Sequence, residues 1–198
     1  MRRAICNIQT DNFEIRLSGS GGQGLISAGV VLAEAIGIGD GKNVVQAQSY
    51  GPEARGGATR CDVIISDTEI YFPECTKFDI LLCLTQEAYD KYANDLKPEG
   101  IMIIDEHDVE ALSDFDIVEV PFIKSATDDL KAKIVANIIA LGFIAQFTKV
   151  VTKKSLKQSV VNRFEGTKHL DLNDKALELG YKLAKKAQKE REKKMKRK

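Results

Sequence analysis

The residues best suited to chemistry are the glycines and the amide of the segment Gly19-Ser20-Gly21-Gly22-Gln23-Gly24. An apolar run, 13–18, precedes this segment and a helix-forming run, 25–36, follows it, so the sequence predicts a strand, a tight loop and a helix. Glycine lets the oxygens of a ligand approach backbone N–H groups. The first N–H groups of a helix are unpaired and carry partial positive charge. The anion-binding candidates are therefore Gly19, Gly21, Gly22, Gln23 and Gly24, although Gln23 can equally act only as a helix cap.

The same loop fits the dinucleotide fingerprint in one respect and departs from it in another. The spacing Gly19-x-Gly21-x-x-Gly24 between a strand and a helix is typical of NAD and FAD sites. Such sites also need an Asp or Glu at the end of the second strand, but the second apolar stretch, 43–48, ends in glutamine. Three interpretations stay open: an independent dinucleotide site, a tight turn without a ligand, and contact with an anionic group in a larger assembly.

A second unusual loop follows residues 43–48 and has the sequence Ser49-Tyr50-Gly51-Pro52-Glu53-Ala54-Arg55-Gly56-Gly57. If the two loops follow adjacent strands, they meet at the carboxyl edge of the sheet, where open α/β folds bind ligands. The Arg55 guanidinium can hold a carboxylate or phosphate there through two hydrogen bonds, or it can form a surface pair with Glu53. Tyr50 can stack on a ligand or pack over the glycine loop. The candidates from this loop are Tyr50, Gly51, Arg55, Gly56 and Gly57.

The remaining polar residues do not assemble a catalytic centre. His107 and His169 have no second histidine or cysteine at ligand spacing, so we expect surface residues and no metal site. The four cysteines contain no CxxC pair, so we expect this chain alone to build neither an iron–sulfur nor a zinc site. Asn137 is polar within an apolar helix, and we expect it to bond a neighbouring backbone group or a partner chain. Without a nucleophile and base, the chain reads as a binding or docking part of an enzyme.

Length and composition favour one domain. At 198 residues and 43% apolar content, the chain can bury one substantial core. We divide it into an N-terminal extension, 1–12, a single domain, 13–184, and a basic tail, 185–198, with nine basic and two acidic residues. We interpret the tail as a solvated, fraying helix end, because a nucleic-acid surface also places basic residues on the folded face. The sequence shows neither a signal peptide nor a membrane-spanning run, so we expect a cytoplasmic protein that binds neither membrane nor nucleic acid.

The elements that position the loops alternate between strands and helices. Strands are predicted over 13–17, 43–48, 79–84, 101–105 and 116–122, with an edge hairpin of 59–66 and 69–72. Helices are predicted over 25–36, 86–96, 130–147 with Thr127 as cap, 155–164 with Ser155 as cap, and from about 172 onward. The alternation predicts an α/β, Rossmann-like three-layer fold, with a mostly parallel sheet, an edge hairpin and helices on both faces.

Together the two loops resemble one family, the gamma subunits of the 2-oxoacid:ferredoxin (or other acceptor) oxidoreductases. The resemblance covers roughly residues 13–181. The motifs that carry it are the glycine loop, Ala28-Gly29, the segment 49–57, Phe78-Asp79, and the segments 136–142 and 172–181. The Pro52-Glu53-Ala54 sequence is most similar to the 2-oxoglutarate enzymes, with pyruvate, branched-chain 2-oxoacids and indolepyruvate as competing substrates.

The resemblance implies oxidative decarboxylation of a 2-oxoacid with coenzyme A to an acyl-CoA, carbon dioxide and reduced ferredoxin. It places thiamine diphosphate, Mg and iron–sulfur clusters in partner subunits, and none of them in this chain. The expected partners are alpha and beta subunits, with delta as a further candidate, and ferredoxin as the electron acceptor of the complex. The glycine loops are expected to shape the substrate or coenzyme A side of the site, with Asn137 as an interface candidate. The alternatives are a non-catalytic interaction module of such a complex and a stand-alone dinucleotide-binding protein.

Overall fold

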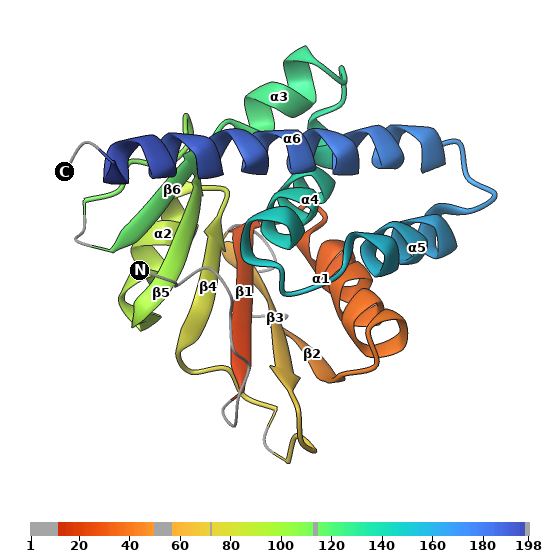
Figure 1. Cartoon of the computed structure of the whole chain (residues 1–198), viewed down its shortest axis with the longest axis horizontal. Helices are drawn as coiled ribbons and strands as arrows, with labels where there is room; N and C mark the ends of the chain where they lie inside the picture. Colours follow the sequence, from red (N-terminus) through yellow and green to blue (C-terminus); the bar gives the residue numbers. More distant parts are fainter. Residues whose placement is uncertain (1–11, 50–56, 72, 113–114, 197–198) are drawn as a thin grey trace.

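The structure is a computed structural model that describes residues 12–49, 57–71, 73–112 and 115–196 (Figure 1). Its strands are β1 (Phe13–Ser20), β2 (Asn43–Ser49), β3 (Ala58–Ser66), β4 (Phe78–Cys83), β5 (Leu96–Asp105) and β6 (Asp116–Val120). Its α-helices are α1 (Leu25–Glu34), α2 (Gln86–Tyr92), α3 (Phe122–Asp128), α4 (Ala136–Thr148), α5 (Lys153–Phe164) and α6 (Leu170–Met195). A π-helical turn, Ala35–Gly39, extends α1, and short 3-10 turns, Ala93–Asp95 and Lys133–Val135, follow α2 and precede α4.

The described strands form one sheet in the order β2-β3-β1-β4-β5-β6. Strands β1, β4, β5 and β6 are parallel to one another, whereas β3 is antiparallel to both β1 and β2. Because β3 is reversed relative to both of its neighbours, β1 and β2 run in the same direction. The arrangement confirms the α/β fold with a mostly parallel sheet that the sequence predicts.

The edge hairpin is formed by different segments of the chain from those predicted. The antiparallel pair at the edge consists of β2 and β3, in register from Asn43 with Ser66 to Ser49 with Arg60. Residues 69–71, expected as a strand, form none in the described part of the chain, and the Tyr71 side chain is 84% exposed. The physical reason is that β1 and β2 already occupy both edges of β3, so no hydrogen-bonding edge of that strand remains for a further partner.

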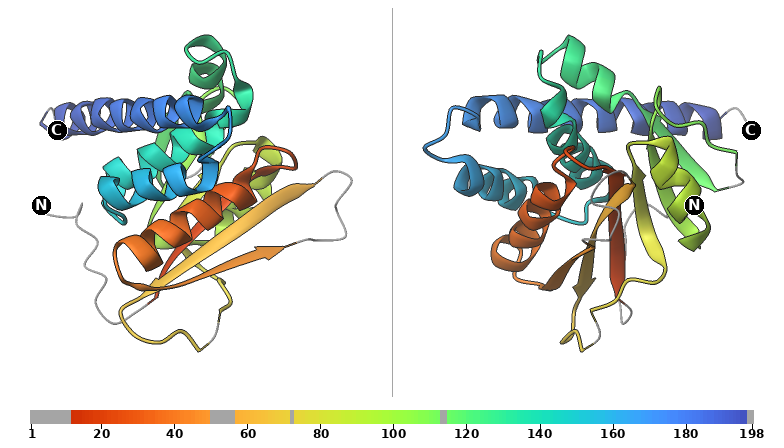
Figure 2. Two further views of the ribbon diagram at one scale, coloured as in Figure 1. Left: turned by 90° about the vertical axis from the view of Figure 1, so that its right-hand side faces the viewer. Right: turned by 180° about the vertical axis from the view of Figure 1, so that it is seen from behind.

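Helices cover both faces of the sheet, but unequally. Helices α1, α4, α5 and α6 lie on the same side of the sheet (Figure 2), over the larger apolar core, to which Ile15 and Leu17 contribute. Helix α2 covers the opposite face over a smaller core that contains Phe78 and Leu81. Side chains alternate between the two faces along a strand, so β3, β4 and β5 supply both cores, whereas the apolar side chains of β1 enter only the larger one. The three-layer prediction is therefore confirmed, with most of the helical mass on one side.

The caps of two helices differ from the prediction. The helix expected over 130–147 begins later, at Ala136. Thr127 lies inside α3, where its hydroxyl donates to the carbonyl four residues earlier at 2.9 Å. A residue with helical backbone cannot cap the next helix, because an N-cap residue has non-helical backbone. At α5 the cap is Thr152, not Ser155, because Thr152 has the extended backbone and its hydroxyl accepts from the Ser155 N–H at 3.2 Å.

Helix α4 is the centre of the larger core, since each of its residues is buried. Helix α6 approaches it at two glycines, Gly142 on α4 and Gly180 on α6. A Cβ atom on Gly180 would lie 2.1 Å from the Ile139 carbonyl oxygen, and one on Gly142 would lie 2.4 Å from that of Leu177. No side chain fits at these distances. The two glycines therefore allow direct contact between the backbones of α4 and α6.

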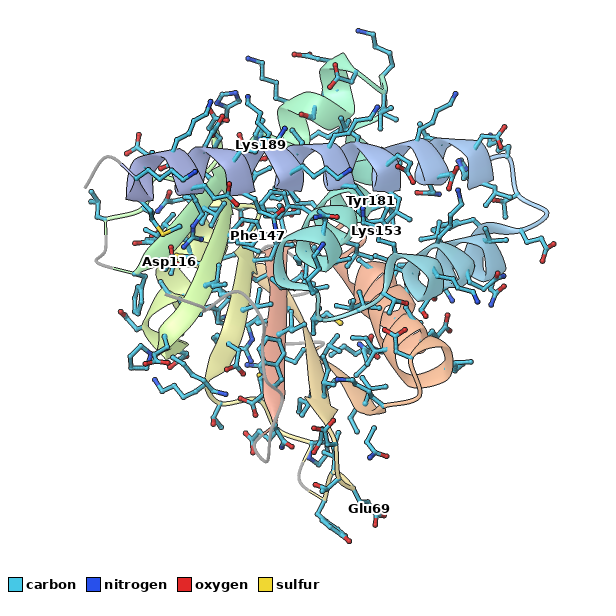
Figure 3. All side chains as sticks on the ribbon, in the orientation of Figure 1. Glu69, Asp116, Phe147, Lys153, Tyr181 and Lys189 are labelled. Atoms are coloured by element: carbon cyan, nitrogen blue, oxygen red, sulfur yellow. The ribbon has the colours of Figure 1, made fainter. Side chains whose placement is uncertain are left out.

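The basic segment predicted to fray is helical as far as Met195. Arg191 binds the Asp116 carboxylate at 2.5 Å, and its guanidinium lies 5.4 Å from the centroid of the Phe147 ring. Figure 3 labels Asp116 and Phe147, which lie below this end of α6. The Gln188 side chain also donates to the Gln146 carbonyl at 3.3 Å. These contacts on β6 and α4 explain why the helix continues past residue 185.

A buried ion pair joins β3 to β1. Arg16 and Asp62 are opposite each other in the strand register, and the guanidinium donates to the two carboxylate oxygens at 2.6 and 2.7 Å. It also donates to the Cys75 carbonyl at 3.2 Å and lies over the rings of Phe78 and Tyr92. Arg16 and Asp62 are only 2% and 4% exposed. A buried charge is tolerated when it is paired and hydrogen-bonded, so the pair strongly favours this register over a shifted one.

Removing the carboxylate should therefore destabilise the fold strongly. We expect Asp62→Ala to lower the free energy of unfolding by about 3–5 kcal/mol, because it leaves the Arg16 charge buried without its partner. The matched control is Asp116→Ala, which removes the exposed pair with Arg191 and should cost less than about 1 kcal/mol. Urea denaturation followed by circular dichroism measures both. Equal losses from the two variants would contradict a dominant role for the buried pair.

Candidate functional site

The glycine loop connects β1 to α1 at the carboxyl edge of the sheet. The condition that the two glycine loops follow adjacent strands is not met, because β3 lies between β1 and β2. They nevertheless leave the sheet at the same edge, since β1 and β2 run in the same direction. Ser20, at the end of β1, is paired with Ala58, at the start of β3, so the second loop returns to the sheet beside the first.

Of the second loop's candidates, Gly57 lies within the described residues and has a φ of 148°, a conformation that favours glycine. The candidates Tyr50, Gly51, Arg55 and Gly56 lie outside the described residues. Their proposed contacts remain predictions from the sequence.

Gln23 forms hydrogen bonds with Ser20 within the glycine loop. Its Oε1 atom accepts from the Ser20 N–H at 2.8 Å, and its own backbone N–H donates to the Ser20 carbonyl at 3.4 Å. A Cβ atom on Gly19 would lie 2.2 Å from this Oε1 atom. The absence of a side chain at Gly19 makes room for the Gln23 side-chain amide, whose oxygen bonds within the loop itself.

The other side of the loop is held by Asn137, at the start of α4. Gly24 is the N-cap of α1, has a φ of 70° and receives no side-chain capping bond. Its carbonyl accepts from Ala28 N–H at 3.0 Å and from Asn137 Nδ2 at 2.9 Å. Asn137 Oδ1 accepts from the Ile138 N–H at 2.8 Å. Of the two partners expected for Asn137, the structure thus supplies the neighbouring backbone, and the interface role stays a prediction.

The two middle glycines, Gly21 and Gly22, are exposed and differ from their neighbours. Gly22 has a φ of 85°, so its backbone conformation favours glycine. Gly21 has neither a positive φ nor a crowded position, since the nearest described atom to its Cβ would be Thr59 Oγ1 at an ordinary 3.8 Å. Packing among the described residues does not require a glycine at position 21. A bare backbone at this exposed position is suited to close approach by a ligand or a partner.

The described cysteines are not suited to cluster ligation. Burial raises the pKa of the Cys61 thiol to about 11 and that of the Cys83 thiol to about 12, and it also raises the pKa of Cys75, with the Asp62 carboxylate adding to the effect. These side chains are therefore neutral thiols packed in the core. Across the described ranges, no three His, Cys, Asp or Glu side chains are grouped in a way that can hold a metal ion.

Two buried charged features have clear structural roles: the Asp105 carboxylate, whose place at the end of a predicted strand is typical of a turn former, and the Arg16–Asp62 ion pair. Asp105, at the end of β5, is buried and accepts from the N–H groups of His107, Asp108 and Ile123 at 2.9–3.2 Å. It therefore joins the turn after β5 to the start of α3. The sequence interpretation missed the Arg16–Asp62 pair, although its signal was visible: a charged residue between Ile15 and Leu17 in a central strand needs a buried partner.

The fold and the site define a class of protein: a Rossmann-like α/β subunit. Its candidate site, as far as the structure describes it, consists of backbone amides at an exposed glycine loop. The model of the family described as pyruvate ferredoxin/flavodoxin oxidoreductase matches residues 14–183, and the chain belongs to this family. The gamma-subunit recognition made from the sequence is confirmed. No helix within the described residues is both long and apolar enough to cross a membrane.

Relatives of known name or structure agree with this assignment. The chain is 45% identical to the 2-oxoglutarate synthase subunit KorC of Methanocaldococcus jannaschii, over 87% of this chain and 94% of KorC. It resembles the crystal structure of the keto/oxoacid ferredoxin oxidoreductase gamma subunit from Geobacter sulfurreducens, with 46% identity, a TM-score of 0.78, and coverage of 87% and 98% of the two chains. A 2-oxoglutarate:ferredoxin oxidoreductase from Magnetococcus marinus, with 2-oxoglutarate, coenzyme A and succinyl-CoA bound, matches with 25% identity and a TM-score of 0.78, over 89% of this chain and 32% of that one.

The contact between Gly24 and Asn137 predicts a selective effect of adding one methyl group. Gly24→Ala places a side chain at a φ of 70° and 2.6 Å from Asn137 Nδ2. We expect it to lower the free energy of unfolding by about 2–4 kcal/mol, from left-handed strain plus an unpaired buried amide.

The matched control is Gly41→Ala, which has a φ of 71° but no atom within 4 Å of the added Cβ. It should cost about 1 kcal/mol, from backbone strain alone. Thermal and urea unfolding of the two variants measure the difference. If both lose the same stability, the Asn137 contact does not constrain the loop.

Proposed function

We propose that this chain is the gamma subunit of a 2-oxoglutarate:ferredoxin oxidoreductase. In this reaction 2-oxoglutarate and coenzyme A give succinyl-CoA and carbon dioxide, and the two electrons released pass to ferredoxin. The observation that carries the proposal is the 45% identity to KorC, a 2-oxoglutarate synthase subunit, along 94% of KorC's length. A pyruvate synthase subunit, PorC of M. jannaschii, is 28% identical over 94% of its length, which favours the longer oxoacid.

Within the proposed complex, this chain binds and orients while its companions hold the cofactors. Thiamine diphosphate, in a partner subunit, supplies the carbanion chemistry when bound. The described cysteines are buried in the apolar cores, which supports placing the iron–sulfur clusters in partner subunits. The exposed amides around Gly21 and Gly22, next to the unpaired start of α1, fit an anionic group. Coenzyme A and 2-oxoglutarate both carry such groups, and the alpha and beta subunits complete the site.

The substrate assignment is tested with the complex purified from its native source. We expect 2-oxoglutarate to give a kcat/KM at least tenfold above those of pyruvate, 2-oxoisovalerate and indolepyruvate, with coenzyme A required. Reduction of a viologen dye measures turnover without a protein acceptor. Preference for another oxoacid, or turnover independent of coenzyme A, would overturn the proposal.

Arg55 provides the test of the second loop. A hydrogen bond between charged groups contributes about 1.5–3 kcal/mol, so Arg55→Ala should raise the KM for 2-oxoglutarate or for coenzyme A at least tenfold in an assembled complex. Arg163→Ala, at an exposed arginine in the last turn of α5, is the control and should leave both constants unchanged.

The competing function, a pure interaction module, gives the opposite result. In that case Arg55→Ala reduces co-purification with the partner subunits, while any complex that forms keeps normal KM values. Quantifying subunit ratios beside the kinetics separates the two functions. Micromolar binding of NAD(H), NADP(H) or a flavin to the isolated chain in equilibrium dialysis would instead favour a dinucleotide-binding protein.

A further inference from the structure

The glycine loop is bonded on its two sides by two side-chain amides that come from different parts of the chain. Gln23 Oε1 accepts from Ser20 N–H within the loop. Asn137 Nδ2 donates to the Gly24 carbonyl across 113 positions of sequence. The exposed glycines, 21 and 22, lie between these two bonds. The first bond is local to the loop, whereas the second ties the loop to the buried helix α4.

The orientation of the Asn137 amide is fixed by its second hydrogen bond. Its Oδ1 atom accepts from the Ile138 N–H at 2.8 Å, so the Nδ2 group must face the Gly24 carbonyl. Asn137 is 7% exposed and belongs to a helix in which each residue is buried. The donor is therefore positioned by the buried helix α4 and not by the loop itself.

Holding the Gly24 carbonyl also sets the direction of the next N–H group. A peptide unit is planar and trans, so its C=O and N–H bonds point in opposite directions. The Gly24 carbonyl points along α1 to Ala28 N–H at 3.0 Å. The Leu25 N–H belongs to the same peptide unit and must point the other way, out of the start of the helix. The Asn137 amide adds a second hydrogen bond to the same carbonyl and so supports this orientation of the peptide unit.

We infer that Asn137 is a positioning residue, whose amide directs the Leu25 N–H outward from α1 toward the group that binds at the glycine loop. The inference rests on the proposed function for the identity of that group, but its structural part does not. Asn137 contacts neither substrate nor cofactor in this account. Its effect passes through the single peptide unit between Gly24 and Leu25.

The structural part is tested by amide hydrogen exchange on the full chain with Asn137→Ala. Freeing the Gly24 carbonyl should weaken the Ala28 bond, so we expect the Ala28 amide to exchange at least tenfold faster. The Leu156 N–H makes the equivalent first-turn bond in α5, to the Thr152 carbonyl at 3.0 Å, and should keep its rate. Unchanged exchange at Ala28, or equal acceleration at both amides, would overturn the inference.

The functional part is tested by kinetics on the assembled complex with Asn137→Asp. This variant keeps the shape of the side chain but directs a carboxylate oxygen at the Gly24 carbonyl. We expect the KM for coenzyme A or 2-oxoglutarate to rise at least tenfold, with kcat within about twofold of the wild type.

The matched control is Asn173→Asp. Asn173 is 4% exposed, and its Nδ2 donates to the His169 carbonyl at 2.9 Å at the start of α6. A residue that only stabilises the fold would lower the unfolding temperature without moving KM, and this is the result expected of Asn173→Asp. An equal rise in KM from both variants would overturn the inference. Faster exchange at Ala28 with an unchanged KM for Asn137→Asp would keep the positioning role and remove the loop from the proposed binding site.

Discussion

The reversed strand β3 is the constraint on which the arrangement of the site depends, and the Arg16–Asp62 pair holds it. Because the pair is buried and its guanidinium lies over Phe78 and Tyr92, a shift of β3 by one residue would leave both charges buried without their partners. The strand is therefore strongly held in one register against β1. That register brings the start of β3 to the end of β1, and it places the exits of β1 and β2 at one edge of the sheet.

The glycines of the first loop serve different purposes. Gly19 makes room for the Gln23 amide, and Gly24 makes room for Asn137 while adopting a left-handed backbone. Gly21 has no such structural reason among the described residues. The loop is therefore hydrogen-bonded to side chains at both of its ends, whereas its middle glycines are exposed. In the proposed function, such a loop would bind an anion without the cost of ordering a flexible segment first.

The support for this loop comes from the depth of the core. Asn137 is held by α4, and α4 is held by backbone contact with α6 at Gly142 and Gly180. Helix α6 is bonded in turn to β6, because its Arg191 binds Asp116 at the start of that strand. A continuous series of packed elements therefore links the exposed loop to β6 at the edge of the sheet.

The sequence by itself determined the strand–loop–helix character of residues 13–36, the mostly parallel α/β fold and the family, because these follow from local periodicity, glycine spacing and motif identity. It did not determine that β3 lies between β1 and β2, that residues 69–71 form no strand, or that Thr127 belongs to α3. It also did not reveal that Asn137 faces Gly24. These features depend on which edges and donors are already occupied when distant segments meet. Which strand edges and hydrogen-bond donors are already paired depends on the packing of the whole chain, so a local pattern of residues cannot predict it.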